Sequence, residues 1–153
     1  MTGLANSAVL RPAKGPDALA LKELEKAANL IALSHIYPPS QFPYPDADVL
    51  ARWEAVLADP ATTTLVGTDA QGLTCFVAFD HGARLRHLAV RPDLWGSGLA
   101  ASLLAASTAT RLWCLEQNHR ARRLYERHGW VPTGVSQPSE FPPHPVEVEY
   151  RRS

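Results

Sequence analysis

Two glycines separated by one residue, Gly96 and Gly98, follow an extended run ending at Val90, and a helix is expected from about Gly98 to Thr108. The first turn of a helix leaves N–H groups unpaired, and with the helix dipole they form a site for an anion such as a diphosphate. Glycine lets the anion approach the backbone because it has no side chain. The segment therefore predicts a diphosphate-binding turn, with an ordinary strand-to-helix turn as the alternative.

The glycine spacing differs from two other phosphate motifs. A dinucleotide-binding fingerprint has a third glycine and lies between parallel strands, whereas the strands before this segment are expected to be antiparallel. A Walker-type loop needs Gly-Lys-Ser/Thr, which does not follow here. A nucleotide-binding protein of either kind is therefore not expected.

A second segment also carries side chains suited to chemistry. Asn118, Ala121 and Tyr125 follow an expected strand, and the four-residue step places Ala121 and Tyr125 on one helix face. A tyrosine has an ordinary pKa of about 10, so Tyr125 is protonated at pH 7 and can donate a hydrogen bond to a developing anion. A packed core tyrosine is the alternative interpretation.

Together the two segments resemble the GNAT superfamily of acyl-CoA N-acyltransferases. The matching pattern runs from about Leu85 to Trp130 and consists of Val90-x-Pro92, Gly96-x-Gly98-x-Ala100 and Asn118-x-x-Ala121-x-x-x-Tyr125-x-x-x-Gly129-Trp130. The resemblance implies direct transfer of an acetyl group from acetyl-CoA, the co-substrate, to a primary amine of a small molecule or peptide. It implies neither a covalent enzyme intermediate nor a metal. We expect residues 1–153 to form a single GNAT-like domain.

The resemblance also assigns residues to the site. Tyr125 is the expected catalytic residue, since it would stabilise the departing CoA thiolate, and Asn118 would lie beside the cofactor. In the family the position of Trp95 usually holds Gln or Arg, so only backbone contacts are expected there. The backbone expected to hold the pantetheine and acyl group is that of Leu88, Ala89 and Val90. The backbone expected to hold the diphosphate is that of Trp95, Gly96, Ser97, Gly98, Leu99, Ala100 and Ala101.

The base that deprotonates the acceptor is not assigned. An alkyl amine has a pKa of about 10.4, so a base or a water chain helps at pH 7. Many relatives have a glutamate on the strand before the glycine turn, where this chain has Arg84. Strand alternation predicts that His87 lies opposite Arg84, Arg86 and Val90, and we interpret it as structural. Other candidates near the expected acceptor site are His35, Glu54, Glu140 and His144.

The acceptor half is expected where prolines concentrate. Pro38 to Pro45 and Pro132 to Pro145 predict loops, because proline lacks an N–H group and fixes φ. Cys114, inside an expected strand, is interpreted as a small core residue and not as an acyl carrier. The aromatic side chains that could line an apolar acceptor pocket are Tyr37, Phe42, Tyr44 and Trp53, although packing explains Trp53 equally well.

Hydrophobic periodicity predicts the elements that position these residues. An amphipathic helix after Asp17 has Leu21, Leu24, Ala28 and Ile31 on its buried face, and a second helix ends at Asp59. The fold class is α/β of the α+β type, with a mixed, mostly antiparallel sheet of six to seven strands and about four helices. The expected strands are Ala8–Leu10, Thr62–Val66, Leu73–Phe79, Ala83–Val90, Arg111–Glu116, Trp130–Val135 and Val146–Arg151.

Charge and composition limit the partners and the compartment. Lys+Arg and Asp+Glu both number 15, so net charge does not favour nucleic acid or a membrane. Two cysteines, no signal-like start and no long apolar run favour a cytoplasmic protein. A homodimer is compatible with this interpretation. The last helix carries Arg120, Arg122, Arg123 and Arg127, and these arginines predict a solvated helix face. One of the four side chains could reach the 3′-phosphate of CoA.

Two other functions stay open. The missing strand carboxylate motivates an acyl-CoA binding or sensing module without turnover. The arginines of the last helix are the only support for a toxin-like acetyltransferase acting on aminoacyl-tRNA.

Overall fold

A seven-stranded sheet in the order β1-β2-β3-β4-β5-β7-β6 forms the centre of the computed structural model, which describes residues 9–153. Neighbouring strands are antiparallel except β4 and β5, so the predicted fold class is confirmed. The strands are β1 (Arg11–Pro12), β2 (Thr62–Asp69), β3 (Gly72–Asp80), β4 (Arg84–Val90), β5 (Arg111–Leu115), β6 (Val131–Pro138) and β7 (Val146–Arg151). The α-helices are α2 (Ala18–Ala32), α3 (Asp46–Ala58), α4 (Leu99–Ala106) and α5 (His119–Arg127), with short 3-10 turns at Gly15–Asp17 and Pro92–Leu94.

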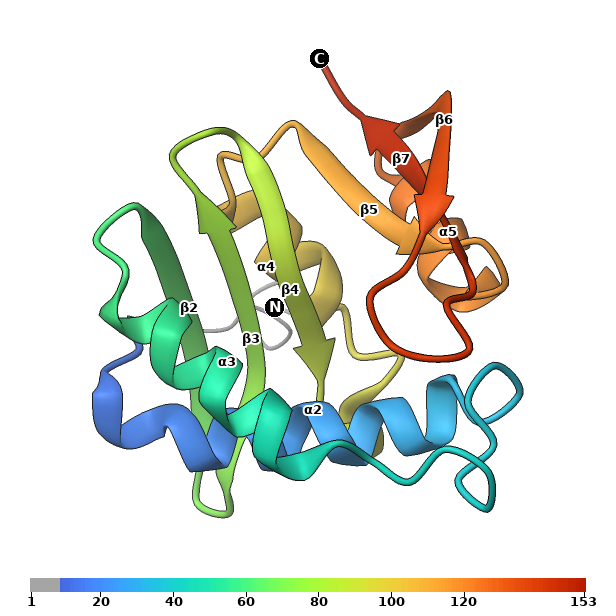
Figure 1. Cartoon of the computed structure of the whole chain (residues 1–153). Helices are drawn as coiled ribbons and strands as arrows, with labels where there is room; N and C mark the ends of the chain where they lie inside the picture. The colour runs from blue at the N-terminus through green and yellow to red at the C-terminus, as the bar shows by residue number, and fades with distance from the viewer. Residues whose placement is uncertain (1–8) are drawn as a thin grey trace.

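Helices cover both faces of the sheet (Figure 1). On one face, α2 and α3 bury Leu21 and Trp53 against Phe76 of β3, and the Trp53 and Phe76 rings meet edge to face at 4.9 Å. On the other face, Leu103 of α4 and Tyr125 of α5 belong to a second buried cluster. The apolar residues that predicted these helices are thus buried in two separate cores, one on each face of the sheet.

The sheet opens between β4 and β5. These parallel strands pair only at Arg84 with Arg111 and at Leu85 with Leu112, and β4 then continues without a strand partner on that side (Figure 1). On its other side the register with β3 shifts, so that Arg86 forms a bulge between Leu85 and His87. A bulge bends its strand, which is consistent with the separation of β4 from β5.

The bulge corrects one prediction from strand alternation. Leu85 packs on the side of α4, whereas His87 contacts the Trp53 ring on the side of α3 at 5.1 Å. Arg84 lies over the ring of Trp113, which is also on the α3 side. The prediction that His87 lies opposite Arg84 is therefore wrong, because the extra residue in the strand shifts the alternation.

Two predictions near the N-terminus are also wrong. The first strand is Arg11–Pro12 and not Ala8–Leu10; Ala8 lies outside the described residues. Backbone pairing with Leu65 and Val66 determines this strand, and proline is tolerated because the strand is at the sheet edge. Ile31 is 58% exposed, since the buried stripe of α2 ends near Ala28.

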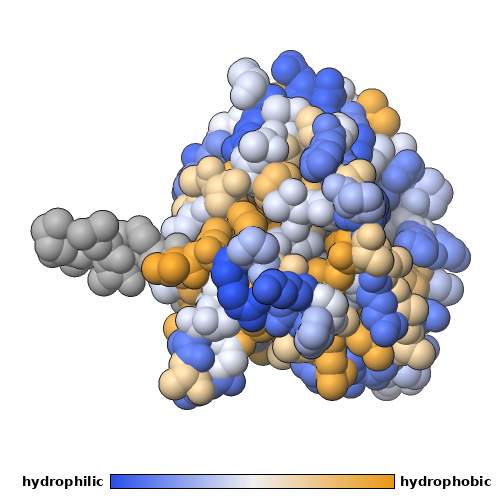
Figure 2. All heavy atoms as spheres, turned by 90° about the vertical axis from the view of Figure 1, so that its left-hand side faces the viewer, coloured by the Kyte–Doolittle hydropathy of each residue, from blue (hydrophilic) through white to orange (hydrophobic). Residues whose placement is uncertain are grey.

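The surface on the side of the sheet formed by β1 and β2 is chemically mixed. Figure 2 shows small groups of hydrophobic side chains among hydrophilic ones on this face. Within residues 9–153, none of the helices combines the length and the apolar character needed to cross a membrane.

Candidate active site

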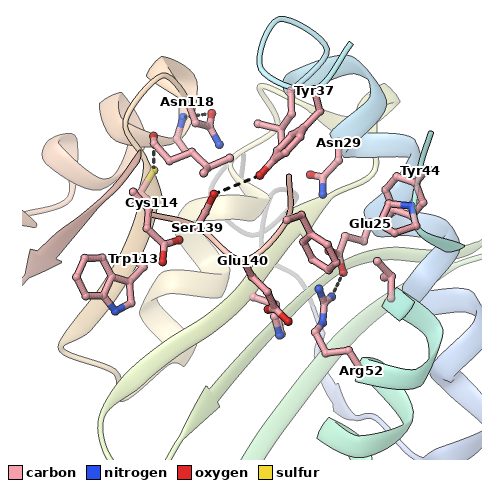
Figure 3. A pocket seen from close by; sticks show the side chains of 18 of the residues that line it. Glu25, Asn29, Tyr37, Tyr44, Arg52, Trp113, Cys114, Asn118, Ser139 and Glu140 are labelled. Atoms are coloured by element: carbon pink, nitrogen blue, oxygen red, sulfur yellow. Dashed lines mark hydrogen bonds and ion pairs between the residues drawn. The ribbon is translucent and has the colours of Figure 1, made fainter. Parts of the chain in front are cut away.

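A cavity of about 640 Å³ lies beside the opening between β4 and β5 (Figure 3). Its walls come from α2, α3, β4, β5, α5 and two loops that are far apart in the sequence. One loop follows α2 and contributes Tyr37, Gln41, Phe42, Pro43, Tyr44 and Pro45, and the other precedes β7 and contributes Ser139, Glu140, Phe141 and Pro142. The two proline-rich stretches predicted as the acceptor half therefore meet around one cavity.

Hydrogen bonds hold these two loops in place. The hydroxyl oxygens of Tyr37 and Ser139 lie 3.4 Å apart and join the loops directly (Figure 3). His35 Nε2 lies 2.8 Å from the carbonyl oxygen of Gln117, which ties the first loop to the start of α5. His144 Nδ1 lies 2.9 Å from the carbonyl oxygen of Ser139, within the second loop. Side chains as well as backbone thus set the shape of the cavity.

Tyr125, the expected catalytic residue, lines this cavity from α5. Its ring packs between Trp130 and Tyr150, with centroids 6.1 and 6.0 Å away. Tyr150 is itself fixed, because its hydroxyl accepts from Arg122 Nε at 2.8 Å and donates to Glu126 Oε2 at 2.5 Å. Burial raises the pKa of Tyr125 above its ordinary value, so its phenol stays protonated at neutral pH. The hydroxyl is therefore a donor in a fixed place.

Asn118 has a structural role as well as a place in the cavity wall. Its Oδ1 accepts a hydrogen bond from the N–H of Ala121 at 3.3 Å and so caps α5, the helix that carries Tyr125. Asn118 and Ala121 both line the cavity. The contact of Asn118 with a cofactor stays a prediction.

The glycine turn presents backbone N–H groups at the start of α4. Gly96 and Gly98 have φ of 83° and 89°, a left-handed conformation that favours glycine. The N–H groups of Trp95 and Ser97 donate to Pro92 and Leu94. Five other N–H groups of this turn have no hydrogen-bond acceptor within residues 9–153. They belong to Gly96, Gly98, Leu99, Ala100 and Ala101. The turn therefore offers several backbone donors at one helix start, and their binding of a diphosphate stays a prediction.

The other expected cofactor contacts lie on the free edge of β4. Leu88 lines the cavity, whereas none of the residues from Trp95 to Ala101 does. The Val90 carbonyl oxygen accepts from Trp95 Nε1 at 2.7 Å, so this side chain fixes the turn to the end of β4. The free edge of β4 from Arg86 onward thus runs between the cavity and the glycine turn. A long ligand that binds the turn at one end can reach the cavity with the other.

A polar cluster that sequence analysis missed lies at the α2–α3 wall of the cavity. Glu25 Oε1 accepts from Trp53 Nε1 at 2.8 Å and from the guanidinium of Arg52. The hydroxyl of Tyr44, Nε of Arg52 and Nε2 of His87 are buried and have no hydrogen-bond partner in the described part of the chain. Sequence analysis did not single out Glu25, because its partners Arg52 and Trp53 come from α3 and were not predictable.

The structure separates the base candidates. Glu140 lines the cavity, whereas His35, Glu54 and His144 do not. His87 also lines it, and burial followed by the charges of Arg52 and Arg86 lowers its pKa, so it is neutral at pH 7. Arg84, at the position of the family glutamate, instead pairs with Glu149 at 3.3 Å.

The cavity wall carries more acidic than basic groups. Four carboxylates face two guanidinium groups, and Arg86 lies 3.6 Å from Asp80, outside the wall. The acidic lining residues are Glu25, Asp48, Glu140 and Glu147, and the basic ones are Arg52 and Arg86. Such a balance favours a cationic ligand such as an amine.

Known proteins share this architecture. Residues 60–132 match the family model described as an acetyltransferase (GNAT) domain. A GCN5-related N-acetyltransferase from Rhodopseudomonas palustris is 20% identical, with a TM-score of 0.76 and 96% of each chain covered. The PaiA N-acetyltransferase from Thermoplasma acidophilum, solved with coenzyme A, is 15% identical, with a TM-score of 0.65 over 95% of this chain and 99% of that one. A spermidine N-acetyltransferase, SpeG, from Vibrio cholerae is 18% identical, with a TM-score of 0.63 and 94% of each chain covered. A search of curated proteins found no match.

These findings confirm the resemblance that the motifs indicated. Residues 60–132 match the model of the GNAT acetyltransferase domain, and the chain has the fold of GNAT acetyltransferases.

Proposed function

We propose that the protein transfers an acetyl group from acetyl-CoA to a primary amine of a small molecule. The observation that carries the proposal is that Tyr125, packed in place and protonated, lines the cavity beside the opening between β4 and β5. The CoA complex of PaiA and the spermidine N-acetyltransferase, which share the fold, support CoA as the carrier and an amine as the acceptor. We also propose that residues 1–153 form one domain; the cytoplasmic location and the homodimer stay predictions.

The residues present fit acetyl-CoA. The free N–H groups of Gly96 and of the residues from Gly98 to Ala101 would hold the diphosphate, and the edge of β4 from Leu88 to Val90 would align the pantetheine. The co-substrate supplies an activated thioester carbonyl. The amine attacks this carbonyl carbon, the carbon–sulfur bond breaks, and Tyr125 stabilises the departing sulfur by a hydrogen bond or a proton. Most of the rate enhancement would come from holding both reactants in position.

The cavity wall suits a small cationic acceptor. Its excess of carboxylates attracts an ammonium group, and rings such as those of Phe42 and Phe141 provide apolar surface for methylene groups. The acceptor has to lose a proton before attack, and Asp48 and Glu140 are cavity carboxylates that have no hydrogen bond or ion pair within residues 9–153. His87 Nε2 also has no hydrogen-bond partner there, but its lowered pKa makes it a weaker base. Since the two loops meet over the cavity, a small molecule fits the site better than a folded peptide segment.

The test is the Tyr125→Phe variant, assayed with acetyl-CoA and a panel of primary amines. We expect kcat to fall about 100-fold or more, since loss of a positioned acid has effects of this size. Acetyl-CoA affinity should change little, because the diphosphate contacts come from α4. Tyr150→Phe is the matched control, since it removes a hydroxyl of a residue that does not line the cavity.

The outcomes separate the candidate functions. An unchanged kcat in Tyr125→Phe would remove Tyr125 from the mechanism. Tight binding of acetyl-CoA by the wild type without transfer to any amine would favour the sensing module, to which the Arg84–Glu149 pair at the position of the usual carboxylate lends support.

A further inference from the structure

The glycine turn has no free cation of its own. The sequence between Arg91 and Arg111 contains neither lysine nor arginine nor histidine. Arg91 is already paired, because its guanidinium lies 2.7 Å from Asp69 and 2.7 Å from Asp93. Coenzyme A carries a diphosphate and a 3′-phosphate, so backbone dipoles alone would face several negative charges.

A guanidinium group from another element fills this gap. Arg120, in the first turn of α5, lies 4.2 Å over the ring of Trp95, the residue directly before Gly96. The indole is fixed by its hydrogen bond to the Val90 carbonyl oxygen. A cation over an aromatic face is attracted by the ring electrons, so Trp95 serves as a platform that orients Arg120.

Arg120 is available for a ligand. Its side chain is exposed, and within residues 9–153 it has no ion pair or hydrogen bond. Arg122, two residues further on, instead binds the Tyr150 hydroxyl and the Glu116 carbonyl oxygen. Arg123 is exposed and makes no hydrogen bond, ion pair or ring contact in the described part of the chain. Arg120 is therefore the α5 arginine that the fold brings to the glycine turn.

We propose that Arg120, stacked on Trp95, binds a phosphate of coenzyme A at the glycine turn and sets the affinity for the phosphorylated end of the co-substrate. This inference rests on the proposed function. The planar guanidinium can donate two parallel hydrogen bonds to phosphate oxygens, which a side chain in the turn itself does not provide. Trp95 thus acts through Arg120, as a positioning residue.

The first experiment measures coenzyme A binding by calorimetry for the wild type, Arg120→Gln and Arg123→Gln. Both variants remove one positive charge from α5, but only one of these charges lies at the turn. We expect Arg120→Gln to weaken binding about tenfold and to reduce its salt dependence, as loss of one charge-assisted contact does. Arg123→Gln should bind within about twofold of the wild type.

The second experiment identifies the phosphate and tests the platform. If Arg120→Gln weakens the binding of coenzyme A but not that of dephospho-coenzyme A, Arg120 binds the 3′-phosphate. If the variant loses affinity for both compounds equally, Arg120 binds the diphosphate. Trp95→Phe should keep most of the affinity and Trp95→Leu should lose as much as Arg120→Gln, since only the former keeps a ring.

Three outcomes would overturn the inference. Equal affinities of Arg120→Gln and Arg123→Gln would show that Arg120 does not contact the ligand, while leaving the proposed function intact. Full affinity in Trp95→Leu would remove the platform. A wild type that does not bind coenzyme A at all would overturn the proposed function as well.

Discussion

The two sides of the opening between β4 and β5 are built differently. The proposed site at the glycine turn is made of backbone, because N–H groups at the start of α4 have no acceptor within residues 9–153 and Trp95 fixes the turn through the Val90 carbonyl oxygen. The cavity is a side-chain site, formed where two loops meet and held by contacts such as that of Tyr37 with Ser139. A backbone site depends on conformation, whereas a side-chain site depends on the identity of each residue. Substitutions on the two sides should therefore fail in different ways.

The largest effect is expected from Gly98→Val, which adds a branched side chain where φ is 89°. The turn would have to leave the left-handed region, and the free N–H groups at the start of α4 would no longer converge. We expect coenzyme A affinity to fall at least about 100-fold, since several hydrogen bonds are lost together. Calorimetry measures this loss directly.

A matched control separates loss of the site from loss of stability. Gly129 ends α5 with φ of 88°, and a Cβ there would meet no atom within 4 Å. Gly129→Val should lower the melting temperature about as much as Gly98→Val while coenzyme A affinity stays near the wild-type value. Retention of affinity in a folded Gly98→Val variant would contradict the placement of the diphosphate.

A smaller effect on the other side is expected from Tyr37→Phe, which removes the hydroxyl that contacts Ser139 and leaves the ring in place. The loop after α2 would be held less firmly, so the acceptor KM should rise about two- to fivefold, the effect of one modest hydrogen bond. Coenzyme A affinity should not change. Steady-state kinetics with an accepted amine, together with calorimetry, measures both quantities.

Ser139→Ala tests the same contact from the second loop. If the two hydroxyls act as a pair, the double variant should raise the KM no further than either single variant. Additive effects, or a change in coenzyme A affinity, would show that the loops are not coupled through this contact.

The same contrast explains how far sequence analysis reached. Gly96 and Gly98 were predicted because conformational freedom is a local property that appears in the order of residues, whereas the catalytic role of Tyr125 was implied by the resemblance to the GNAT superfamily. Glu25 was missed because its partners, Arg52 and Trp53, come from a different helix. Local patterns thus predicted the backbone turn, while the residues around the cavity required the packing of distant elements.

The strands of the sheet were also predicted only as far as local patterns allow. Most strands were predicted within a few residues, and β7 was predicted with its full bounds. The bulge at Arg86 was not, because strand alternation assumes a regular register and gives no sign of an extra residue. One unpaired residue therefore changed the face assigned to His87 relative to Arg84.

The smallest effect is expected from Cys114→Ala, although this thiol lines the cavity together with Tyr125. Burial raises the pKa of Cys114 to about 12, so almost no thiolate exists at neutral pH and the thiol is a poor nucleophile. If the acetyl group passes directly from acetyl-CoA to the amine, the kcat of Cys114→Ala should stay within about twofold of the wild-type value, because Cys114 then contributes only to packing. Cys75→Ala is the control for lost packing, because Cys75 is fully buried and does not line the cavity. A loss of turnover in Cys114→Ala alone, with an acetylated cysteine in the wild type detected by mass spectrometry, would show that the acetyl group passes through the protein and that the side-chain site takes part in the chemistry itself.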